Sequence, residues 1–184
     1  MKKHYAFLRN SVAPEVSLFL CLLTLAGNAQ AVDITFTATF QAPTCEVSAP
    51  ATLDFDTVAS AEIKQGTSPE LPMDITLSQC AGFIGTTQKP GIKVTGTGTT
   101  GTGDFLFRSA TSQAVNYGVR ITTSTNEVVQ NNTFLPAALT SENFDGGSTT
   151  IPLTVGLSCG NKCNDAETKS GALNASVTFA FAYQ

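Results

Sequence analysis

The sequence contains a single histidine and little charge. That histidine is His4, near the start of the chain, and only 13% of all residues are charged. His4 lies in the segment that we predict below to be removed as a signal peptide. The mature chain would then have no histidine, which excludes Ser-His and Cys-His nucleophile pairs, histidine metal clusters and imidazole acid-base catalysis. Asp54 and Asp56 could share one face of a strand as paired carboxylates, but two exposed acids beside a loop are usually just solvated. The structural interpretation of Asp54-Phe55-Asp56 is a strand with Phe55 facing inward. We therefore expect no enzymatic activity, no cofactor and no metal.

An apolar run long enough to cross a membrane is also missing. The longest, around Leu18 to Ala26, has about ten residues, whereas a transmembrane helix needs ~20. Basic residues precede it, and the small-x-small sequence Ala29-Gln30-Ala31 follows it. This order is typical of a secretory signal peptide. We predict a signal peptide at residues 1–31, cleavage before Val32, and no transmembrane segment in the mature chain.

The mature chain, residues 32–184, is acidic and lightly charged. It has seven Lys and Arg against thirteen Asp and Glu, a net charge of −6. Such a surface argues against nucleic acid or an anionic membrane as the natural partner. Its 153 residues suit one domain with a real hydrophobic core.

Four cysteines remain after the signal peptide: Cys45, Cys80, Cys159 and Cys163. An even number in an exported chain favours disulfides, and four cysteines allow three pairings. We expect Cys45 to pair with Cys80 and Cys159 with Cys163, because the residues from 159 to 163 resemble a turn closed on itself. The alternative is a four-cysteine zinc site, but only the second pair approaches the tight spacing that zinc sites use.

Helical periodicity is absent from the mature chain beyond single turns. Val, Ile, Thr and Phe instead form short alternating runs separated by turn residues, which predict strands and a β-sandwich. These runs are Leu71–Leu77, Ile92–Val94, Phe105–Phe107, Tyr117–Ile121 and Ile151–Leu157. Gly96 to Gly103, made only of Gly and Thr, is interpreted as a mobile connection; a phosphate-binding loop is discarded because no Lys-Ser/Thr ending follows.

The two ends of the mature chain carry the clearest alternation. Near the C-terminus Val177, Phe179, Phe181 and Tyr183 share one face, and no charged residue occurs from Ala172 onward. Natural proteins usually protect such a strand edge with charge, proline or cover, so the fold or a partner must cover this one. Near the N-terminus Val32, Ile34, Phe36, Ala38 and Phe40 alternate in the same way. Two open, complementary strands at opposite termini suggest head-to-tail assembly.

Taken together, these features resemble the pilin subunits of chaperone-usher fimbriae of Gram-negative bacteria. The resemblance covers nearly the whole mature chain. Its parts are the alternating extension from Ile34 to Phe40, the sequence Ala42-Pro43-Thr44-Cys45-Glu46-Val47, a second cysteine at Cys80, Gly171 as the fourteenth residue from the end, and the penultimate aromatic Tyr183.

The resemblance implies an all-β fold: an incomplete immunoglobulin-like β-sandwich that lacks its last strand and is completed by a donor strand from another chain. It divides the sequence into a signal peptide (1–31), an N-terminal donor-strand extension (32–42) and a pilin domain (43–184). The implied partners are a periplasmic pilus chaperone, an outer-membrane usher and neighbouring pilin subunits. The protein would pass through the periplasm to the cell surface and become part of a fimbrium.

The resemblance also implies roles for individual residues. The donor side chains would be Ile34, Phe36, Ala38 and Phe40. The groove strand would include Gly171, Val177, Phe179, Phe181, Tyr183 and Gln184, with the carboxylate of Gln184 held by basic residues of the chaperone. The chain departs from the family pattern at Ala38, where many relatives have glycine, and in its Cys159/Cys163 pair.

Two other interpretations are open at this stage. The two alternating termini could be neighbouring strands of a complete, monomeric sandwich that acts as a secreted binding module. A receptor-binding adhesin is the other possibility, although two-domain fimbrial adhesins carry an extra lectin domain and usually lack a donor extension.

Overall fold

The computed structural model describes residues 37–38 and 42–184. The predicted signal peptide and the predicted donor residues Ile34, Phe36 and Phe40 lie outside the described residues. Ala38 is described; it is exposed and belongs to no strand. The chain divides after Thr39 into two units, and the second, Phe40–Gln184, contains all the strands given below.

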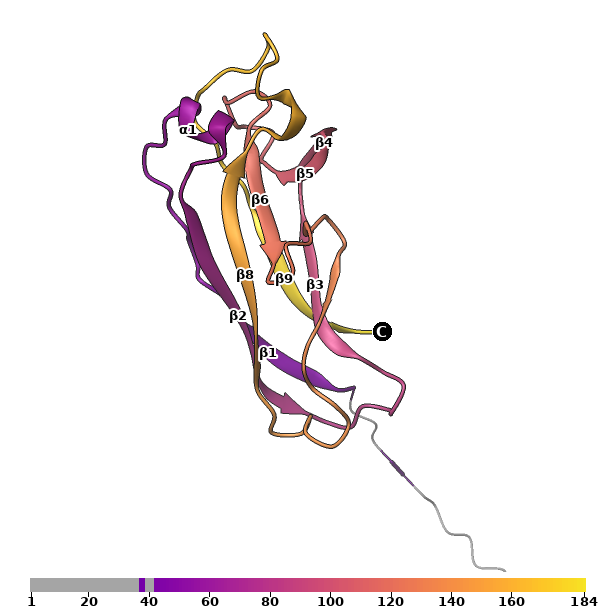
Figure 1. Ribbon diagram of the computed structural model, residues 1–184. Helices are drawn as coiled ribbons and strands as arrows, with labels where there is room; N and C mark the ends of the chain where they lie inside the picture. The colour runs from indigo at the N-terminus through magenta and orange to yellow at the C-terminus, as the bar shows by residue number, and fades with distance from the viewer. Residues whose placement is uncertain (1–36, 39–41) are drawn as a thin grey trace, which may run out of the picture. The chain divides into compact units, whose positions relative to one another are not determined.

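This second unit is built from two antiparallel sheets (Figure 1). The larger sheet has six strands in the order β1-β2-β8-β6-β5-β4, with the bounds Thr44–Ser48, Glu70–Ala81, Thr149–Ser158, Gly118–Thr123, Asp104–Phe107 and Gly98–Thr102. The smaller sheet has the order β7-β3-β9, with the bounds Phe134–Pro136, Pro90–Gly96 and Val177–Tyr183. The strands expected from alternation between Leu71 and Leu157 and at Val177–Tyr183 are therefore present, and the nearly all-β fold is confirmed.

The core lies between the two sheets. Along β2 the residues Met73, Ile75 and Leu77 are buried and alternate with exposed or half-buried ones, as a strand with one core face requires. Ile92 and Val94 of β3 belong to the same buried cluster. Burial of a side chain of this size contributes ~1.5–3 kcal/mol, so this cluster is a main source of the domain's stability.

The Gly-Thr run does not form the mobile connection that the sequence predicted. Residues 98–102 form β4, which pairs with β5 at the edge of the larger sheet. The strands approach so closely that a Cβ at Gly98 would collide with the carbonyl oxygen of Leu106. Gly103 makes the turn between them with φ of +92°, a conformation that glycine adopts without steric cost. The prediction of a mobile connection was wrong because these glycines allow β4 and β5 to pair closely.

Two short helical segments were not predicted. The helix α1 spans Ser60–Gln65 and ends at Gly66, and the 3-10 helix η1 spans Gly160–Lys162. Six and three residues are too few to produce a helical pattern of apolar residues. Neither could cross a membrane, and the described part of the chain contains no helix that is long and apolar enough to do so.

Residues Asp54 to Asp56 are not a strand, although the sequence predicted one. Asp56 has a positive φ of 52°, and its backbone N–H donates a 2.8 Å hydrogen bond to Oδ1 of Asp54. This local turn takes the place of a strand ladder. Phe55 nevertheless packs against the core, as expected, while both carboxylates are exposed.

Candidate functional site

The last strand, β9, has a strand partner on only one side. It is the outer strand of the smaller sheet, and the part of the chain that the structure describes supplies no ladder to its other edge. Beyond the end of the ladder, Gln184 and Lys89 exchange two backbone hydrogen bonds of 2.7 and 3.1 Å. In an antiparallel ladder, residues that exchange backbone hydrogen bonds with the partner strand alternate with residues whose backbone groups point away from that strand. The backbone groups of Val177, Phe179, Phe181 and Tyr183 therefore point toward the open edge.

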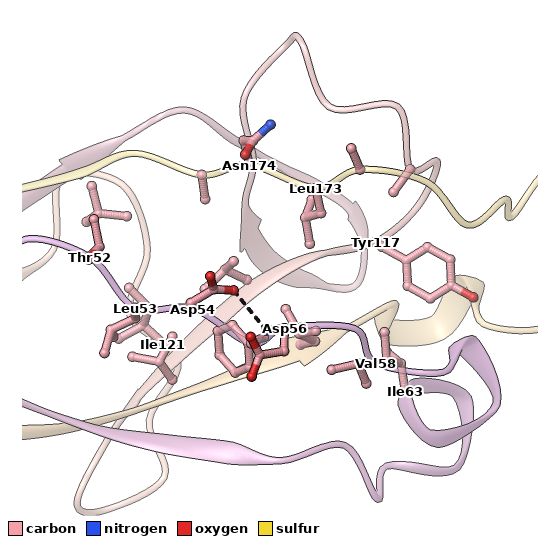
Figure 2. A pocket seen from close by; sticks show the side chains of 18 of the residues that line it. Thr52, Leu53, Asp54, Asp56, Val58, Ile63, Tyr117, Ile121, Leu173 and Asn174 are labelled. Atoms are coloured by element: carbon pink, nitrogen blue, oxygen red, sulfur yellow. Dashed lines mark hydrogen bonds between the residues drawn. The ribbon is translucent and has the colours of Figure 1, made fainter.

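Beside this open edge lies a groove of about 850 Å³ (Figure 2). One wall is the segment 50–58, and the other is formed by residues 170–175 with Val177 and Phe179 of β9. The floor consists of apolar side chains of the larger sheet: Met73, Val119, Ile121, Val155 and Leu157. An apolar floor and an unpaired strand edge are what an added β-strand requires, with pockets for its side chains and partners for its backbone.

At one end the groove is bordered by a small second core. Tyr117 is buried there with Ala114 and Cys159, and Ile63 of α1 and Leu173 pack against them. Figure 2 shows Tyr117 and Ile63 at the same end of the pocket, with Leu173 nearer its middle. We call this the helix end of the domain. The buried Tyr117 directly precedes β6, in the run Tyr117–Ile121 that the sequence predicts to be a strand.

The disulfide between Cys159 and Cys163 belongs to this helix end. Its Cα atoms are 5.0 Å apart, and both cysteines belong to the second core. In the same loop the backbone N–H of Glu167 and the ammonium of Lys162 lower the pKa of Asp165. Lys162 and Asp165 form an ion pair of 3.2 Å. The loop that adjoins the groove is thus held by a covalent bond and by local charge.

The other disulfide lies at the opposite end of the domain. Cys45 in β1 and Cys80 in β2 are bonded, with Cα atoms 4.0 Å apart, which confirms the predicted pair. Close by, the Cα of Pro43 would lie 3.1 Å from a Cβ placed on Gly82. β9 also ends here, because its Tyr183 pairs with Pro90 at the start of β3. We call this the extension end, since the N-terminal segment joins the domain at Pro43.

The predicted groove residues do not all have the same surroundings. Val177, Phe179 and Gly171 line the groove. Phe181 instead packs against Phe144, with ring centroids 6.0 Å apart, and Tyr183 at the end of the strand is 41% exposed. Gln184 pairs with Lys89 through its backbone.

The segment 50–58 and the floor were missed by the sequence reasoning. The floor residues were recognised only as strand residues, without the groove they would face. Leu53 and Phe55 gave a weak signal, since they alternate with polar residues in the wall segment. Within residues 37–38 and 42–184, no cluster of His, Cys, Asp or Glu side chains could hold a metal ion.

Two antiparallel sheets, a last strand with one unpaired edge and an apolar groove beside it define an incomplete immunoglobulin-like β-sandwich, the fold of pilus subunits. The sequence comparison agrees. Residues 34–184 match the family described as fimbrial protein, and the chain belongs to this family.

Solved structures of pilus proteins are similar to the chain. One comes from a study titled as the structure of a chaperone-usher pilus that reveals the molecular basis of rod uncoiling; it has a TM-score of 0.57 and 19% identity, over 85% of this chain and 97% of that one. The P pilus rod subunit PapA has a TM-score of 0.57 and 21% identity, over 77% of this chain and 99% of its own. No curated protein matches the chain.

The family and the fold establish a pilus subunit with a structural, non-enzymatic role in a surface fimbrium. Association with other pilin subunits follows from that role.

Proposed function

We propose that this subunit polymerises by donor-strand exchange. The N-terminal extension, residues 32–42, of one copy enters the groove of the next copy and lies beside β9. The observation that carries the proposal is the open edge of β9 next to an apolar groove of about 850 Å³. The extension supplies the matching pattern, with Ile34, Phe36, Ala38 and Phe40 on one face.

The energetic gain from this exchange is large. Three large donor side chains buried at ~1.5–3 kcal/mol each, together with the methyl group of Ala38 at ~0.8 kcal/mol, contribute on the order of 5–10 kcal/mol. That is comparable to the whole folding free energy of an ordinary domain, roughly 5–15 kcal/mol. A subunit with an empty groove is therefore expected to have little stability alone.

The direction of the extension favours exchange over insertion into the same domain. The extension joins the domain at Pro43, at the end where β9 finishes. If it folded back into its own groove, it would run parallel to β9, whereas every strand pair in the described sheets is antiparallel. An extension from a second copy can enter in the antiparallel direction, which gives slightly more stable pairing.

Export and assembly factors are part of the proposal. The exposed apolar groove would promote aggregation before assembly. A periplasmic chaperone that fills the groove temporarily, with basic residues holding the carboxylate of Gln184, would prevent this. An outer-membrane usher would then deliver subunits to the cell surface. The signal peptide predicted at residues 1–31 supports this export route.

A peptide-binding experiment tests the exchange directly. A mature chain that lacks residues 32–41 is refolded with a fluorescent peptide of those residues. We expect a stable one-to-one complex, because the peptide buries its apolar side chains in the groove. A control peptide with Phe36→Asp should bind at least about 100-fold more weakly, since an unpaired carboxylate would enter an apolar pocket. Equal binding of the two peptides, or a truncated chain that folds stably and ignores both, would contradict donor-strand exchange.

A further inference from the structure

Three large apolar side chains are exposed in the described part of the chain. They are Phe83 at 76%, Tyr183 at 41% and Val115 at 37%. Tyr183 belongs to β9 and lies at the open strand edge. Phe83 and Val115 take no part in the groove, and they lie at opposite ends of the domain. Single exposed apolar residues are common, so their positions decide whether they have a role.

Phe83 lies at the extension end. It follows Gly82, whose backbone packs against Pro43, where the extension leaves the domain. The backbone N–H of Gly82 donates a 3.2 Å hydrogen bond to Oδ1 of Asp145. The disulfide of Cys80, two residues earlier, ties the same loop to β1. Phe83 is therefore held at a fixed place beside the base of the extension.

Val115 lies at the helix end, on the outer side of the groove's rim. Its backbone N–H donates a 2.8 Å hydrogen bond to the carbonyl of Lys169, and the two residues form an isolated β-bridge. The preceding residue, Ala114, lines the groove and donates a 3.1 Å hydrogen bond to the carbonyl of Ala172. Val115 is thus part of the rim at the helix end of the groove. A donor strand that runs antiparallel to β9 would leave the groove at this end, which we call its mouth.

The short connection between extension and domain brings these two ends together. Only Gln41 and Ala42 separate Phe40, the last donor residue, from Pro43. Three residues span at most about 10 Å. When Phe40 of one subunit occupies the mouth of the groove, the extension end of that subunit must therefore lie against the helix end of the next. The short tether gives the two surfaces a high effective concentration.

We propose that Phe83 of each subunit packs on Val115 and the adjoining rim of the following subunit. The occupant of this surface is a second copy of the chain, and the inference rests on the proposed donor-strand exchange. The contact is heterologous: it joins two different patches, and it repeats along the fibre. It fixes the orientation between successive domains, which a covalent connection of three residues alone does not determine.

A disulfide cross-linking experiment tests the contact in the complete mature chain. Phe83→Cys and Val115→Cys are combined, subunits are assembled into fibres, and a mild oxidant is applied. Heat-denatured fibres are then separated on a non-reducing gel. We expect a ladder of covalent multimers.

Each single variant should give dimers at most, because one new cysteine per chain cannot extend a covalent series. Phe83→Cys combined with Ser124→Cys is the matched control; Ser124 is exposed in the loop after β6 and should give no ladder.

The outcomes separate this contact from strand exchange itself. Fibres without a ladder overturn the contact and leave the exchange intact. If the native chain forms no fibres through its extension, donor-strand exchange fails and the contact fails with it. If only the double cysteine variant fails to assemble, a photoreactive benzoylphenylalanine replaces Phe83 in the otherwise native chain. A cross-linked peptide that includes Val115 then supports the contact, and any other cross-linked site, or none, overturns it.

Discussion

Moving residues 32–41 behind Gln184, through a linker of two to five residues, should give a monomer that melts far above the chain lacking those residues. In this rearranged chain the donor segment follows β9 directly, so it can turn back and pair with it as an antiparallel hairpin. It then fills the groove whose floor includes Val119 and Ile121. Burial of its three large apolar side chains and of the Ala38 methyl group contributes on the order of 5–10 kcal/mol.

The measurement compares thermal unfolding and size-exclusion elution of the two chains in oxidising buffer. A domain of this size gains about 2–4 °C in melting temperature per kcal/mol, so the rearranged chain should melt about 10–40 °C higher. The matched control is the rearranged chain with Phe36→Asp in the moved segment, which should lose most of the gain. Two equally stable monomers would show that the sandwich needs no donor strand.

The strands were predictable because their apolar side chains recur at every second residue. Ile75 and Leu77 are buried in the middle of β2, and the alternating pattern around them identifies both the strand and its inward face. The same holds for β9, whose Val177 and Phe179 face the core side as expected. A strand with one buried face leaves a local signal that needs no tertiary information.

β4 escaped prediction because its stability comes from its backbone. The segment 98–102 has only one buried side chain, Thr102, and it is held as an edge strand by its ladder to β5. Glycines that allow close approach leave no apolar pattern in the sequence. Backbone pairing of this kind depends on which strand lies alongside, and that is a property of the complete fold.

The sequence predicted only one of the two walls of the groove. The sequence identified Val177 and Phe179, but the opposite wall, residues 50–58, pairs with no strand and is interrupted by the turn at Asp56. Phe181 has the same period as Phe179, yet it packs on Phe144 from a distant loop. Residues on the same face of one strand can therefore have different neighbours. Which of them line the groove depends on segments that are distant in the sequence.

The two disulfides should differ in their effect on stability. Cys45→Ala with Cys80→Ala should lower the free energy of unfolding by about 4 kcal/mol, and Cys159→Ala with Cys163→Ala by about 2 kcal/mol. The first bond closes a loop across 35 positions and the second across only 4, so the first restricts the unfolded chain more strongly. Replacing both cysteines of a pair avoids a free thiol that could exchange with the remaining bond.

Urea unfolding of the rearranged, self-completed chain provides the measurement, because its monomers should unfold in one reversible transition. Each double variant is compared with the parent at equal denaturant slope. Loss of the first bond also frees β1 and Pro43 at the extension end, so fibres of this variant should dissociate at lower urea than native fibres. Equal losses for the two pairs would mean that local packing in the second core, around Tyr117 and Cys159, contributes as much as the longer covalent loop.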